Sequence, residues 1–159
     1  MRARRAAGIA IIGAIVLCAA LAGVLAPHDP FRSGIDYLSP PAPGNWLGTD
    51  ELGRDILSRI LFGARTSLAV GIGAAVVATL IGTTVGLIGG YARGRVDLVM
   101  VQGIDLFIAL PGLVLALIIT AMVGATIPNL MMVLGFVMWP TVARLVRGQV
   151  LNIREAVFV

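Results

Sequence analysis

The stretch from Ser67 to Gly90 reads SLAVGIGAAVVATLIGTTVGLIGG and carries no charged side chain. A helix that crosses the hydrocarbon core of a bilayer needs about 20 mainly apolar residues, and this stretch has that length. Three further apolar runs lie at 6–25, 98–123 and 130–146. The sequence therefore predicts an all-α, polytopic membrane protein with about four transmembrane helices, embedded in the lipid bilayer.

The composition supports a membrane protein and excludes several other classes. The chain is 58% hydrophobic and 13% charged, whereas a soluble domain is about 45–50% apolar and about 25% charged. All 12 basic residues are Arg, but they lie between apolar runs rather than in one patch, so we expect no nucleic-acid partner. One Cys, one His and no Lys leave no cysteine or histidine metal site and no phosphate-binding loop. We therefore expect no catalytic, metal-binding or cofactor-binding residues, and no enzyme.

The distribution of arginine predicts the orientation, because cytoplasmic loops are enriched in basic residues. Regions 1–5, 91–97 and 144–155 each carry an excess of Arg over acids. Residues 26–66 carry four Arg against five acids, and the loop 124–129 is uncharged. This alternation predicts a cytoplasmic N-terminus and four crossings.

We divide the chain into three parts: 1–26, with the N-terminal tail and the first span; 27–66, an extracytoplasmic segment; and 67–159, a membrane core. The run 6–25 has two interpretations. Its length exceeds the usual apolar region of a signal peptide and favours an uncleaved anchor, while Ala20-Leu21-Ala22 resembles a cleavage site.

The extracytoplasmic segment changes character along its length. Its first half is rich in proline and is expected to be irregular. From Leu52 to Ala64, apolar residues recur at helical spacing, which predicts a short amphipathic helix on the outer membrane surface, with Asp50-Glu51 at its start. A solvated connector is the alternative.

Small residues recur every four positions through the second span. In lipid, such a stripe lets two helix backbones approach closely, because packing replaces the missing hydrophobic driving force. The stripe predicts either a close crossing within a translocation core or ordinary helix packing. Its members are Ala74, Ala78, Gly82, Gly86 and Gly90.

Asp105 and Pro111 interrupt the third run, and Pro140 lies near the middle of the fourth. An ionisable residue inside an apolar run is a candidate functional residue. Asp105 has two interpretations, a bond to a neighbouring helix and a role in transport. Each proline removes a backbone hydrogen bond and is expected to kink its helix.

Several motifs resemble one family of transport proteins. Residues 46–59 read WLGTDELGRDILSR and are followed by GARTSL at 63–68; DLFIALP follows at 105–111, and Arg144 and Arg147 close the fourth span. Together they resemble the C-type permease subunit of dipeptide, oligopeptide and nickel ABC importers. The outer-segment positions that carry this resemblance are Gly48, Thr49, Asp50, Gly53, Arg54, Asp55, Ser58, Arg59, Gly63 and Arg65.

The resemblance implies the N-terminal part of a type I importer permease in a bacterial or archaeal plasma membrane. It implies three kinds of partner: a second permease subunit, cytoplasmic ATP-binding subunits and an extracytoplasmic solute-binding protein. ATP would be hydrolysed on the separate subunits. Arg147, Arg154 and Glu155 would lie near the ATPase-coupling side, with simple anchoring by positive charge as the alternative for the arginines.

Phe158-Val159 falls just before the expected Glu-Ala-Ala coupling loop, so the sequence is expected to be truncated. A small non-transport scaffold or assembly subunit is the alternative function, and sparse intramembrane charge argues against a channel or secondary transporter. No residue separates peptides from nickel or glutathione as the solute.

Overall fold

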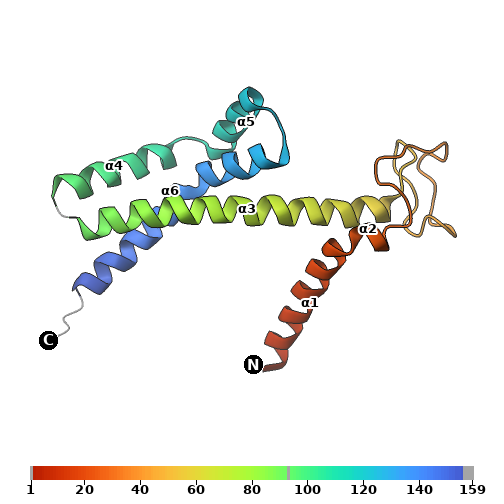
Figure 1. The fold of residues 1–159 in the computed structure, drawn as a ribbon, viewed down its shortest axis with the longest axis horizontal. Coiled ribbons are helices and arrows are strands. Elements are labelled where there is room, and N and C mark those ends of the chain that lie inside the picture. The colour runs from red at the N-terminus through yellow and green to blue at the C-terminus, as the bar shows by residue number, and fades with distance from the viewer. Residues whose placement is uncertain (1, 93, 156–159) are drawn as a thin grey trace. The chain divides into compact units, whose positions relative to one another are not determined.

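The computed structural model describes residues 2–92 and 94–155, which form helices joined by loops (Figure 1). In this part of the chain, β-pairing is limited to two isolated bridges, so the all-helical prediction is confirmed. Arg93 and Phe158-Val159 lie outside the described residues, as does the side chain of Glu155. The helices are α1 (Arg2–Ala20), α2 (Ala22–Leu25), α3 (Ile56–Tyr91), α4 (Arg95–Ala109), α5 (Gly112–Val123) and α6 (Ile127–Glu155).

Two compact units divide the chain, one at 1–69 and the other at 70–159. Two helices, α3 and α6, are long and apolar enough to cross a membrane, and α4 with α5 makes a third span if this bent pair is one crossing. The run 6–25 is divided between α1 and α2 and is not among these candidates. The described residues thus fit a polytopic membrane protein, and four crossings stay a prediction.

Helix α3 corrects the prediction of a separate amphipathic helix at Leu52–Ala64. It begins at Ile56 and continues for 36 residues without a break after Ala64. The start is late because Asp55, not Asp50, caps the helix. The helix continues through the polar residues that follow Ala64, and Thr66 donates its hydroxyl to the carbonyl of Phe62 within it at 3.1 Å.

The third expected span, 98–123, is broken rather than kinked. Helices α4 and α5 meet at an angle of 83° across Leu110 and Pro111 (Figure 1). Leu110 is extended, with φ −77° and ψ 137°, which is the conformation that a following proline favours. By contrast α6 is helical through Pro140, which is fully buried.

Glycines bring α3 and α6 into close contact. A Cβ on Gly82 would lie 2.6 Å from Cβ of Val142, and one on Gly90 would lie 2.7 Å from Cβ of Val150. Atoms at such distances overlap, so only a hydrogen fits at these positions. The small-residue stripe therefore lies on the face of α3 that packs against α6.

The core of the 70–159 unit forms around Trp139 of α6. Ile104 and Ala143 are buried with it, and residues of α3 pack against this cluster. The ring of Phe107 on α4 meets Trp139 edge-on, with centroids 5.2 Å apart. Such aromatic pairs add about 0.5–1.5 kcal/mol beyond their area burial, so this cluster helps to hold α4 against α6.

Replacing Gly86 by Ala is expected to destabilise the 70–159 unit. The new Cβ would lie 2.7 Å from the carbonyl oxygen of Ala143, which belongs to the backbone and cannot rotate away. Overpacking of this kind costs about 1–3 kcal/mol. The measurement is the thermal unfolding midpoint of the purified protein in detergent, which should fall.

Gly71→Ala is the matched control on the same helix. A Cβ there would meet nothing within 4 Å, so its midpoint should stay unchanged or rise slightly with the better helix former. If both variants unfold at the same temperature, the close contact at Gly86 is refuted.

Candidate functional site

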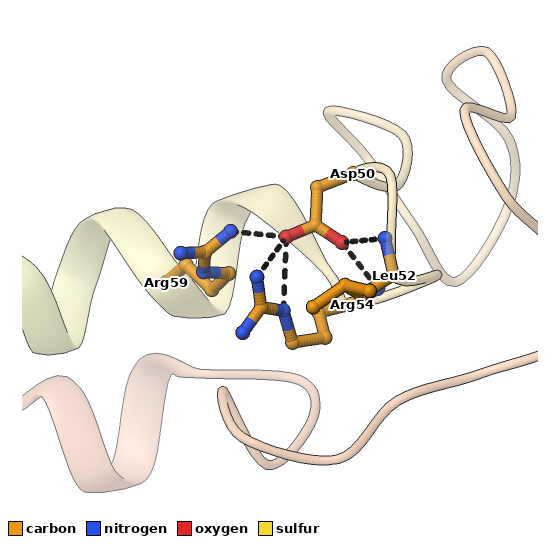
Figure 2. A network of polar contacts seen from close by, with 4 residues as sticks. All are labelled: Asp50, Leu52, Arg54 and Arg59. Carbon is orange, nitrogen blue, oxygen red and sulfur yellow. Dashed lines mark hydrogen bonds and ion pairs between the residues drawn. The ribbon is translucent and has the colours of Figure 1, made fainter.

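Asp50 holds the loop before α3 together (Figure 2). Its Oδ1 accepts hydrogen bonds from the backbone N–H groups of Leu52 and Arg54, both at 2.9 Å. Its Oδ2 accepts from Nε of Arg54 at 2.9 Å and also pairs with the guanidinium of Arg59. One carboxylate thus joins a tight turn to the first turns of α3.

These contacts change the acidity of Asp50. Burial alone would raise the pKa of this carboxyl, but the hydrogen bonds from the backbone of Arg54 and Leu52, with the Arg54 guanidinium, outweigh it. The pKa of Asp50 is lowered from 3.8 to about 2. The side chain is therefore ionised at neutral pH and holds the turn as an anion.

Asp55 and Ser58 form a second buried contact at the start of α3. Oδ2 of Asp55 accepts from the backbone N–H of Ser58 at 2.8 Å and from its hydroxyl at 2.7 Å. The Ser58 hydroxyl oxygen accepts from the backbone N–H of His28 at 3.1 Å, which ties the loop to the helix. These contacts follow ordinary N-capping chemistry and place both residues in structural roles.

Thr49 closes the loop from the other side. Its hydroxyl accepts from the backbone N–H of Ser39 at 3.0 Å and donates to the carbonyl of Asp36. Gly48, with φ +77°, leaves room for this closure, because a Cβ there would lie 2.3 Å from the Ser39 carbonyl oxygen. Gly53 has φ +70° and makes the turn below Asp50 possible.

Two signature positions take no part in this loop network. A Cβ on Gly63 would meet open space, and no side-chain hydrogen bond of Arg65 is found among the described residues. Arg54 and Arg59 also line an open hollow of about 340 Å³ together with Phe31 and Phe62. Most of the signature therefore builds the loop itself, while Gly63 lines this open hollow beside Arg54 and Arg59.

In the 70–159 unit, α6 carries three arginines that contact α3 and α4. Arg147 makes a two-pronged pair with Asp97 of α4, with Nε–Oδ1 at 2.7 Å and Nη2–Oδ2 at 2.8 Å. Arg144 pairs with Asp105 through a single contact between Nη2 and Oδ1. Arg154 donates to the carbonyl oxygen of Gly90 on α3 at 3.1 Å. Asp105 therefore has a partner on a neighbouring helix.

The sequence alone did not identify the pairing of Arg147 with Asp97 or of Arg144 with Asp105. The available signal was spacing: Arg144 and Arg147 are three residues apart and share a helix face, and both acids flank or interrupt the same apolar run. The break at Pro111 and the role of Asn129 in the turn after α5 were also not foreseen. Asn129 Nδ2 donates to the carbonyl of Val123 at 2.7 Å.

The geometry defines a helical membrane protein whose spans are joined by interhelical arginine contacts. Comparison with known proteins names a more particular class. The chain is 36% identical over 154 residues to the dipeptide transport system permease protein DppC of Bacillus subtilis, covering 96% of this chain and 48% of that protein. It is 38% identical over 157 residues to the glutathione transport system permease protein GsiD of Pectobacterium atrosepticum, covering 97% of this chain and 52% of the relative.

The oligopeptide transport system permease protein OppC of Bacillus subtilis is 34% identical over 153 residues, covering 96% of this chain and 50% of the relative. No protein-family model matches the chain. The predicted resemblance to the C-type permease subunits of peptide importers is confirmed by these relatives. The chain spans about half the length of the curated relatives it matches.

The low pKa of Asp50 predicts an acid-induced opening of the loop before α3. A carboxyl whose pKa is depressed in the folded state stabilises that state above its ordinary pKa, and this contribution is lost as the pH falls through the folded value. With values of 3.8 and about 2, protection should be lost between these two pH values. Hydrogen exchange at the backbone N–H groups of Leu52 and Arg54 measures this loss.

Asp50→Asn is the control, because the amide keeps an oxygen acceptor but does not titrate. Its exchange, corrected for the intrinsic pH dependence, should be faster than wild type at neutral pH and should not change across this window. Identical corrected pH profiles in the two proteins would show that the Asp50 charge does not hold the turn.

Proposed function

We propose that the chain forms part of the transmembrane permease subunit of an ATP-driven importer of dipeptides or oligopeptides. The observation that carries the proposal is the similarity, along nearly the whole chain, to permease proteins named for dipeptide and oligopeptide transport. A permease of this kind performs no covalent chemistry. It exposes a solute pathway alternately to the two sides of the membrane while ATP is hydrolysed on partner subunits.

The proposed assembly contains a second permease subunit, cytoplasmic ATP-binding subunits and an extracytoplasmic solute-binding protein. The segment 27–66 would face the binding protein and the second permease, and its outward hollow at Arg54 and Arg59 would contribute to that face. Arg147, Arg154 and Glu155 would lie toward the ATP-binding subunits. The contacts of Arg147 and Arg154 with α4 and α3 support this role, since they join the end of α6 to both helices.

The proposed topology has four crossings in a bacterial or archaeal plasma membrane, with a cytoplasmic N-terminus. Helices α3 and α6 would be two of these spans, the bent pair α4–α5 a third, and the run 6–25 the fourth. The support is the excess of arginine at 1–5 and 144–155 compared with the slightly acidic segment 26–66. The α3–α6 contact at the glycine stripe would form a tightly packed part of the translocation core.

The topology predicts which side of the membrane Ser39 occupies. In a Cys18→Ala background, a Cys at Ser39 should react with a membrane-impermeant thiol reagent added to intact cells. A Cys at Gly94, in the turn before α4, should react only after lysis. If Ser39→Cys is labelled only in lysed cells, the proposed orientation is wrong and segment 27–66 lies on the cytoplasmic side.

Import is tested with the full-length gene product and its partner subunits in proteoliposomes. Labelled dipeptide should accumulate only when ATP and the binding protein are both supplied, because the permease has no energy source of its own. Vesicles without the binding protein are the control. An assembled complex that hydrolyses ATP in response to its binding protein but takes up no peptide would favour a non-peptide solute; failure to assemble with ATP-binding subunits would favour the scaffold alternative.

A further inference from the structure

The two ion pairs between α4 and α6 differ in the number of their contacts and in the exposed fraction of their side chains. The pair of Asp97 with Arg147 is two-pronged, and both side chains are only 25% exposed. The pair of Asp105 with Arg144 has one contact, and both side chains are 57% exposed. Among the described residues, no further hydrogen bond reaches Oδ2 of Asp105 or Nε and Nη1 of Arg144. The first pair is closed, whereas the second retains donors and acceptors for another polar group.

The position of Asp105 along α4 determines how deep its incompletely bonded carboxylate lies in the membrane. Asp105 lies eight residues beyond Asp97 in the same helix, which is about 12 Å at about 1.5 Å per residue. In the proposed topology Asp97 is near the cytoplasmic surface, so Asp105 lies within a hydrocarbon core about 30 Å thick. Charged side chains at that depth face a bundle interior or a water-filled cavity, because facing lipid is unfavourable.

The surroundings of Arg144 are hollow rather than packed. Thr141, Arg144 and Leu145 of α6 line an open hollow of about 480 Å³ with Ile108 of α4. The polar groups that line this hollow are the hydroxyl of Thr141 and the guanidinium of Arg144, and aliphatic side chains surround them. Asp105 does not line the hollow itself but is paired with Arg144, which does. A volume of this size accommodates a small peptide end, and Arg144 with its paired Asp105 offers one charge of each sign beside it.

We propose that Asp105 and Arg144 face the solute pathway and bind the two charged ends of a zwitterionic peptide. The guanidinium of Arg144 would take the terminal carboxylate, and the carboxylate of Asp105 would take the terminal ammonium. This inference rests on the proposed peptide permease function and specifies which residues of the pathway recognise the solute. Bound peptide replaces the single contact of the pair by charge-assisted hydrogen bonds to each partner.

Water access is tested first, in membrane vesicles that hold the full-length permease with its partner subunits. In a Cys18→Ala background, Thr141→Cys should react with a charged, water-soluble thiol reagent, and saturating dipeptide should slow the reaction at least about fivefold. Val76→Cys, on an exposed apolar part of α3, is the control and should not react. An unreactive Thr141→Cys would show that protein covers the pair, and the proposal would be wrong.

Solute recognition is tested by transport kinetics. Loss of one charge-assisted hydrogen bond corresponds to roughly tenfold or more in affinity, so Arg144→Gln should raise the KM for a free dipeptide by about that factor. The same variant should leave the KM for a C-terminally amidated dipeptide nearly unchanged. Asp105→Asn should show the reverse selectivity, with N-acetylated dipeptide unaffected.

Two further variants separate recognition from folding. Arg147→Gln breaks the closed pair and should lower the amount of assembled complex without changing KM selectivity. The exchanged pair, Asp105→Arg with Arg144→Asp, should assemble like the wild type but should not have the wild-type KM for a free dipeptide. Full recovery of transport by the exchange would show that the pair is only a helix clamp.

Failure of the proposed function is distinguishable from failure of this inference. If the wild-type complex imports no peptide, the proposed peptide-import function is wrong, whatever the labelling at Thr141 shows. If wild type imports peptides but free and blocked peptides respond equally to Arg144→Gln, only the inference falls. Labelling at Thr141 without protection by dipeptide would likewise overturn the recognition role.

Discussion

The close approach of α3 and α6 is the contact on which the rest of the 70–159 unit depends. In lipid there is no hydrophobic driving force between two apolar helices, so their association requires tight packing. Glycine at 82, 86 and 90 allows α6 to lie where a Cβ would overlap its atoms. This approach places Trp139 against α3 and creates the surface on which α4 packs. The contact of Arg154 with the Gly90 carbonyl also depends on this approach, because it joins α6 directly to α3.

The arginines of α6 then determine how α4 and α3 are aligned with it. Apolar packing tolerates small slips along a helix axis, but a two-pronged pair such as Arg147 with Asp97 has one geometry. Arg154 adds a contact to the end of α3 through the Gly90 carbonyl. The last turns of α3 and the first turn of α4 are therefore linked to one helix, so a displacement of α6 would be transmitted to both.

Much of the helical content was predictable, because long uncharged runs leave few alternatives to a helix in a membrane. The small-residue stripe at Ala74 to Gly90 was visible as a period of four, although its partner helix was not. Helix boundaries were less predictable. The start of α3 depended on whether Asp50 or Asp55 caps the helix, and both positions offer the same chemistry in the sequence. The structure shows that Asp50 accepts hydrogen bonds from the backbone N–H groups of Leu52 and Arg54 in the loop, so Asp55 is the residue that caps the helix.

Long-range pairs were beyond the reach of the sequence for a different reason. Asp97 and Arg147 are 50 positions apart, and nothing in either local pattern identifies the other. The same holds for the 83° bend at Pro111, because proline in a membrane helix is compatible with a kink, a break or a continuous helix, as Pro140 shows. These outcomes depend on which neighbouring groups satisfy the freed backbone atoms.

The carboxylates of the chain differ in how many hydrogen-bond donors the described residues supply to them. Asp50 accepts from two backbone N–H groups and pairs with two guanidinium groups. Asp55 receives two donors from Ser58 on Oδ2, while its buried Oδ1 has no hydrogen-bond partner among the described residues. Asp105 has one donor and lies within an apolar run. An anion in low dielectric surroundings is strongly unfavourable unless several donors or water surround it. In the proposed topology, the acceptor that Asp105 leaves open calls for water or a polar partner at this face, in addition to Arg144.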